Sequence, residues 1–144
     1  MMQTPEQLAH DLRRAARLAQ SASTAVVRAN AAGVRQSWRD SWKGIRSKPK
    51  IHRVITYETQ AGPGYVEAEI GVDKRIRGAG GSLAHIIEFG SASGNAPRND
   101  GGKALLRQAP EFIAQMGALA GMLLAPGGPV GITAEHRDPA RFNS

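Results

Sequence analysis

The sequence contains no cysteine, and this absence narrows the chemistry open to it. Disulfides, thiolate metal sites and a cysteine nucleophile are all excluded, and a chain without cysteine suits assembly in a reducing cytoplasm. Aromatic residues make up only 5% of the 144 residues, so we expect a thin core built from Ala, Leu and Ile. Small proteins with thin cores often gain stability by oligomerising.

Long apolar runs and targeting segments are also missing. Near the N-terminus, Asp11, Arg13 and Arg14 interrupt the apolar residues, which argues against a signal peptide. The most apolar window, residues 116–125, is much shorter than the roughly 20 residues of a membrane-spanning helix. We therefore expect a soluble chain with no membrane partner.

Acidic residues are outnumbered, with 12 Asp and Glu against 19 Lys and Arg, and the formal net charge is +7. This balance favours an anionic partner, which could be nucleic acid, an acidic protein surface or an anionic membrane. The length predicts one domain over residues 1–124. A Pro- and Gly-rich cluster at 125–129 then begins a C-terminal arm that runs to residue 144.

The first element predicted is a long helix from Pro5 to about Ala32. Thr4 and Gln7 form a capping-box pattern around Pro5, and Gly33 is the expected stop. Such a helix is roughly 40 Å long, more than one small domain easily covers. Apolar residues recur along one side of this helix and form a stripe that is a candidate subunit interface. Alternatively, the alanines are there because Ala favours helix formation, and both interpretations stay open. The stripe consists of Leu8, Leu12, Ala15, Ala19, Ala22 and Val26.

Trp38 and Trp42 are four residues apart, so one helical turn places both indoles on the same side. Aromatic residues interleaved with basic ones can bind single-stranded nucleic acid by stacking. A pair of core anchors that packs a helix onto a sheet is the favoured interpretation. The basic residues of the alternative, nucleic-acid-binding hypothesis are Arg13, Arg14, Arg17, Arg35, Arg39 and Lys43.

Residues 52–59 and 65–72 alternate with period two and predict a β-hairpin with a five-residue loop at 60–64. Pairing Thr59 with Tyr65 gives one apolar face fit to pack on helices. Its residues are Val54, Val66, Ala68, Ile70 and Val72. The opposite face carries Arg53, Tyr57, Glu67 and Glu69, where pairing of the acids with Arg53 is favoured over acid-base chemistry.

The segment 73–82 is basic and rich in glycine, but it lacks the lysine of a phosphate-binding loop. Lys74, Arg75 and Arg77 are candidate contacts to DNA or to an acidic neighbour, and a charged, exposed loop is the alternative. A final helix is predicted from about Gly102 to Leu124, with Pro110 either kinking it or starting a new helix.

The sequence of residues 83–91 predicts a buried apolar element that ends in a turn at Gly90. His85 and Glu88 are three apart, but a histidine at the edge of the core is favoured over a metal ligand. The sequence offers no catalytic triad, no paired-carboxylate pocket and no cofactor loop. We therefore predict no catalytic, cofactor-binding or metal-binding residues, and a protein that is not an enzyme.

This same stretch carries a family resemblance. Ala84 to Ile87, Glu88, Phe89, Gly90 and Ser91, followed by a loop to Pro97, resemble the motif of the tail-completion or neck proteins of long-tailed double-stranded DNA phages, which are related to tail terminators. The resemblance implies that Glu88-Phe89-Gly90 is structural and fixes the turn before an interface loop.

The order of the predicted elements matches the same family over about residues 7–124. It implies an α+β subunit with a long N-terminal helix, a small antiparallel sheet built on the hairpin, a C-terminal helix packed on the sheet, and an extended C-terminal arm. Such subunits form a homo-oligomeric ring, often a hexamer, between the connector or stopper and the tail tube. DNA passes through the ring without being read, and the ring belongs to the virion neck, assembled in the host cytoplasm.

Overall fold

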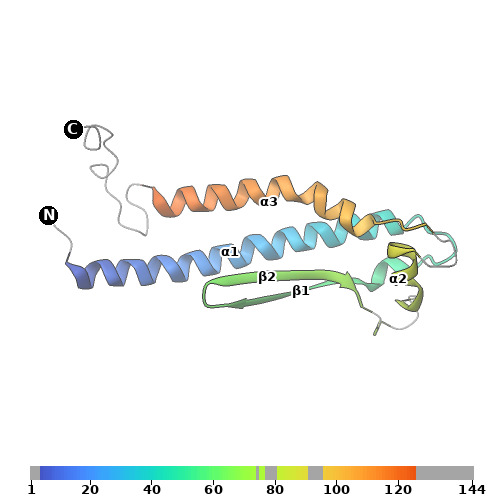
Figure 1. The fold of residues 1–144 in the computed structure, drawn as a ribbon, viewed down its shortest axis with the longest axis horizontal. Coiled ribbons are helices and arrows are strands. Elements are labelled where there is room, and N and C mark those ends of the chain that lie inside the picture. The colour runs from blue at the N-terminus through green and yellow to red at the C-terminus, as the bar shows by residue number, and fades with distance from the viewer. Residues whose placement is uncertain (1–3, 74, 77–80, 91–95, 126–144) are drawn as a thin grey trace.

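The computed structural model describes residues 4–73, 75–76, 81–90 and 96–125. Its elements are α1 (Pro5–Trp42), a 3-10 helix η1 (Ile51–Val54), β1 (Ile55–Gly62), β2 (Tyr65–Val72), α2 (Gly81–Phe89) and α3 (Asp100–Leu124). In Figure 1, α1 runs along the molecule, with α3 along one side and the β-hairpin along the other. The predicted α+β class is confirmed. The C-terminal arm, apart from Ala125, lies outside the described residues.

The start of α1 follows the sequence signal. The backbone N–H of Gln7 donates to Thr4 Oγ1 at 3.2 Å, and the N–H of Thr4 donates to Gln7 Oε1 at 3.0 Å. These reciprocal bonds satisfy donors that have no partner within the helix, and Pro5 needs none. The predicted capping box is confirmed.

The predicted end of α1 at Gly33 was wrong, because the helix continues to Trp42. Val34, Trp38 and Trp42 recur every four residues and are all buried, so packing outweighs the roughly 1 kcal/mol that glycine costs inside a helix. Gly33 instead faces α3: a Cβ atom there would lie 2.7 Å from Gln108 Oε1, so that side chain would have to shift. It marks a helix contact and not a helix end.

The predicted hairpin forms, but its register was wrong. Pro63 and Gly64 alone connect the strands, and Gly64 has a φ of +80°. Thr59 therefore pairs with Ala68 instead of Tyr65. The tight turn shifts the pairing by an odd number of residues, which moves the side chains of β1 to the other face.

The inner face of β2 is as predicted, but the partners from β1 differ. Tyr57 now pairs with Ile70 on the inner face, while the outer face carries Glu58, Glu67 and Glu69. The expected pairing of Glu67 and Glu69 with Arg53 does not occur, because residues 51–54 form a 3-10 turn ahead of the strand.

The core lies at the end of the molecule where the last turns of α1 meet η1 and the start of α3, near α2 (Figure 1). Trp38 and Trp42 meet edge to face with ring centroids 5.8 Å apart, so they are the core anchors that the sequence favoured. The buried cluster consists of Val34, Trp38, Trp42, Ile51, Val54, Ile55, Ala84 and Ala104.

The helix α3 packs mainly along α1. It is one helix with Pro110 inside it, and Figure 1 shows its axis changing direction in its N-terminal half, as expected where a proline removes a hydrogen bond. A polar network fixes the position of α3 on α1. The buried Asn30 donates to Gln115 Oε1 at 2.7 Å and accepts from Gln108 Nε2 at 2.7 Å.

The apolar run of α2 is less buried than predicted. Among its described side chains only Ala84 and Glu88 are buried, whereas Leu83, Ile86 and Phe89 are exposed. The run is a nine-residue helix, which can turn only one face to the core. Its apolar side chains therefore form part of the surface.

Candidate functional site

Glu88 links the end of α2 to the start of α3. Its side chain is 1% exposed, and both carboxylate oxygens accept from the backbone N–H of Gly101 at 3.0 Å. The N-cap of α3, Asn99, has a φ of 52° and makes no capping bond of its own. A glutamate from another helix therefore caps α3, because the first N–H groups of a helix need outside acceptors.

Burial is the main influence on the pKa of the Glu88 carboxylate. Removal from water raises the pKa of Glu88 above its ordinary value, and the nearby Asp100 acts in the same direction. The bond from the N–H of Gly101 opposes that shift, because it stabilises the ionised form. A capping role accounts for this buried acid.

Asp100 ties α1 to the same junction. Its Oδ2 accepts from Trp42 Nε1 at 3.1 Å and from Arg98 Nε at 2.7 Å. The residue is buried, so its charge is balanced by an arginine and a hydrogen bond, as buried charges require.

Gly90, with a φ of 77°, ends α2 in a conformation that favours glycine. The motif residues Glu88 and Gly90 thus build a joint; Phe89 is 60% exposed beside His85, and Ser91 lies outside the described residues.

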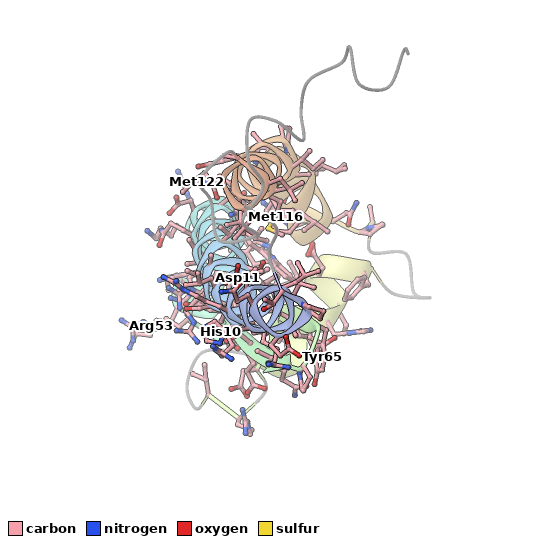
Figure 2. The ribbon with its side chains drawn as sticks, turned by 90° about the vertical axis from the view of Figure 1, so that its left-hand side faces the viewer. His10, Asp11, Arg53, Tyr65, Met116 and Met122 are labelled. Carbon is pink, nitrogen blue, oxygen red and sulfur yellow. The ribbon has the colours of Figure 1, made fainter. Side chains whose placement is uncertain are left out.

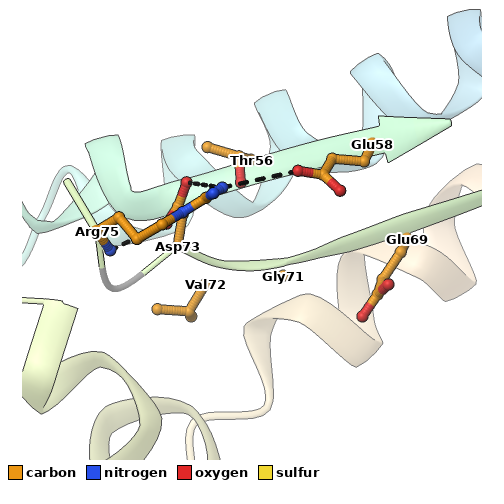
Figure 3. A pocket seen from close by; sticks show the side chains of 7 residues that line it. All are labelled: Thr56, Glu58, Glu69, Gly71, Val72, Asp73 and Arg75. Atoms are coloured by element: carbon orange, nitrogen blue, oxygen red, sulfur yellow. Dashed lines mark hydrogen bonds and ion pairs between the residues drawn. The ribbon is translucent and has the colours of Figure 1, made fainter.

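A hollow at the open end of the hairpin is lined by polar groups (Figure 3). Glu58 and Glu69 oppose each other across the strands. Arg75 binds Asp73 at 2.9 Å and approaches Glu58 at 3.7 Å. These contacts lower the pKa of Asp73 through its bonds to Arg75 and raise the pKa of Arg75.

Arg75, proposed from the sequence as a lumen or DNA contact, is thus held by two carboxylates. Lys74 and Arg77 lie outside the described residues. Three other basic residues are also engaged within the chain. Arg35 stacks over Tyr57 at 4.8 Å, Arg39 donates to Ile55 O at 2.8 Å, and Lys43 pairs with Asp40 at 3.0 Å.

Arg13, Arg14 and Arg17 remain exposed near the N-terminus of α1. Both tryptophans are buried, so neither is available to stack on a base beside these arginines. A basic surface remains, but the two tryptophans that the nucleic-acid-binding hypothesis would use for stacking lie in the core.

An apolar groove opens between β2 and α3, with α1 as its floor. It consists of two adjoining hollows of about 240 and 280 Å³ that share Val34, Ile70 and Leu105. Figure 2, viewed along α1, shows Tyr65 of β2 on one side of that helix and Met116 and Met122 of α3 on another. Sequence reasoning missed the groove, because its lining residues come from four separate elements, α1, β2, α2 and α3. Its principal lining residues are Val34, Ile70, Phe89, Leu105, Ala109 and Phe112.

The N-terminal part of α1 extends beyond the hairpin and α3 (Figure 1). We call residues 4–14, which precede the first buried residue of α1, Ala15, the overhang. Within it Leu8 and Leu12 are 44% and 49% exposed. The remaining residues of the predicted interface stripe, Ala19, Ala22 and Val26, are half-buried.

The described residues contain no cluster of three or more His, Cys, Asp or Glu side chains suited to a metal ion. Nor does any helix among them have the length and apolar character needed to cross a membrane.

Comparisons with protein-family models, curated proteins and solved structures find no significant match. The resemblance to phage neck proteins therefore stays a prediction.

Proposed function

We propose that this protein is a structural subunit of a homo-oligomeric ring at the head-tail junction of a long-tailed phage, as a tail-completion or tail-terminator protein. The observation that carries the ring is the amount of apolar surface outside the small core. Leu8 and Leu12 on α1, Phe89 on α2 and Leu105 on α3 are all exposed. We take these exposed apolar side chains as the contacts between subunits, because exposed apolar surface is where protein contacts form.

The α2–α3 joint supports the same proposal. Glu88 and Gly90 of the neck-type motif hold the start of α3, which forms one wall of the groove. A motif whose buried acid caps a helix fits an architectural protein. In the virion this ring joins the connector or stopper to the tail tube and lets DNA pass without reading its sequence.

The native mass of the full chain, measured over a range of protein concentrations with and without duplex DNA, tests the proposal. A closed ring gives a fixed multiple of the 15.3 kDa subunit, about 92 kDa for a hexamer, and ignores DNA at moderate salt. A monomer at every concentration contradicts the ring. A small oligomer that moves onto DNA and leaves it as salt rises supports the alternative, a basic nucleic-acid-binding module using Arg13, Arg14 and Arg17.

A further inference from the structure

We propose that the overhang of one copy binds in the apolar groove of the next copy, and that this head-to-tail contact closes the ring. The inference rests on the proposed ring and names the two surfaces that meet in it. The overhang presents Leu8 and Leu12, and the groove presents Leu105 and Phe112.

The overhang presents apolar side chains that nothing within the described part of the chain covers fully. Its helical part, Pro5–Arg14, continues without a break into the rest of α1 and projects about 15 Å beyond the first buried residue, Ala15. Leu8 and Leu12 lie one turn apart on one stripe and remain largely in solvent. A contact with another chain would remove both from water, which favours association.

The groove has the size and chemistry to receive these side chains. Each of its two hollows, about 240 and 280 Å³, exceeds the roughly 150 Å³ that holds a benzene-sized group. Leu105 lines both hollows and is 56% exposed, so the groove opens to solvent along its length. Parallel rows of side chains on β2 and α3 form walls that an amphipathic helix can enter with its apolar stripe.

Charge complementarity favours a second copy of this chain as the occupant. The acidic Glu67 lines the groove, and Glu69 and Glu111 are exposed on the elements that form its two walls. The overhang and the turn after it carry Arg13, Arg14 and Arg17, all exposed. Opposite charges at the rim, the glutamates of β2 against these arginines, favour this pairing.

The two surfaces also lie on different parts of α1, because the overhang precedes Ala15 while the floor of the groove is formed by residues from Val27 to Trp38. A contact between two different patches is heterologous, and repeated heterologous contacts give a ring when the rotation between copies closes.

The test uses two variants of the full chain. Leu8→Ser with Leu12→Ser removes the apolar stripe of the overhang and keeps the groove. Leu105→Lys places a charge in the groove and keeps the overhang. Two matched controls alter similarly exposed leucines outside both surfaces. These are Leu18→Ser, off the stripe of α1, and Leu106→Lys, a neighbour on α3 that does not line the groove.

We expect each interface variant to weaken self-association at least tenfold while retaining the circular dichroism of the wild-type protein, and we expect both controls to assemble normally. An equimolar mixture of the two interface variants then gives a heterodimer of about 31 kDa, because one intact overhang still meets one intact groove. Native mass spectrometry separates this species from monomer and ring.

Failure of the inference is distinguishable from failure of the proposed ring. If the wild-type chain forms a ring but the mixture gives no heterodimer, the head-to-tail contact is wrong and the ring stands. If Leu105→Lys disrupts the ring while the overhang variant does not, a different segment occupies the groove and the inference is overturned. A wild-type chain that stays monomeric overturns both.

Discussion

Replacing Glu88 tests whether the joint between α2 and α3 depends on its buried carboxylate. Glu88→Ala leaves the N–H of Gly101 without its acceptor and opens space at a side chain that is 1% exposed. We expect the free energy of unfolding to fall by about 2 kcal/mol, because a lost cap costs about 0.5–2 kcal/mol and an unsatisfied buried donor about 1–3 kcal/mol. These two figures describe the same hydrogen bonds and are not added.

The direction of the pH dependence follows from burial. The folded-state pKa of Glu88 lies above its ordinary value of 4.5, so the folded protein retains a proton that the unfolded chain has lost. The contribution of Glu88 to stability is therefore complete below about pH 4.5 and is lost as pH rises through the folded-state pKa. Relative to Glu88→Gln, which does not titrate, the wild-type protein becomes less stable as pH rises.

Urea unfolding followed by the fluorescence of Trp38 and Trp42 measures both effects. Protein concentration is held fixed, because self-association adds to apparent stability. Glu69→Gln, an exposed glutamate on β2, is the matched control and should change little. A stability difference between the wild type and Glu88→Gln that stays constant from about pH 4 to pH 8, or that runs in the opposite direction, refutes the reasoning.

Further predictions concern the contacts of α3. Gly101→Ala should destabilise by about 1–3 kcal/mol, since a Cβ there would lie 2.7 Å from the ring of Trp38, whereas Gly117→Ala, with nothing within 4 Å, should stabilise by up to about 1 kcal/mol in the same urea titration. Asn30→Ala should cost about 1–3 kcal/mol and speed amide exchange in α3, because it removes the bonds by which Gln108 and Gln115 join α3 to α1; unchanged exchange would contradict a role in fixing α3 on α1. Trp42→Phe should lower stability by about 1–2 kcal/mol through the lost bond to Asp100, and an unchanged unfolding midpoint would show that this bond contributes nothing.

The sequence predicted correctly those features that depend on interactions between residues close together in the chain. The capping box at Thr4 and Gln7 starts α1 as predicted, because its bonds join residues three apart. The alternation of β2 identified its inner face correctly, since successive side chains of a strand point to opposite sides. The spacing of Trp38 and Trp42 placed both on one side of a helix.

Tertiary packing decided what the local signals left open or suggested wrongly. Gly33 is a helix stop by propensity, but burial of Val34 and the tryptophans beyond it continues α1 to Trp42. The hairpin register depended on how tightly Pro63 and Gly64 turn, which alternation alone does not determine.

The sequence by itself determined the α+β class, the order of the elements and the apolar stripe of the long helix, because each follows from period, capping and turn residues along a short stretch. Only the tertiary structure decided that Glu88 caps α3, that α2 turns Ile86 and Phe89 to solvent, and that an apolar groove lies between β2 and α3. Those features join residues far apart in the chain, and their positions follow from how the elements pack against α1.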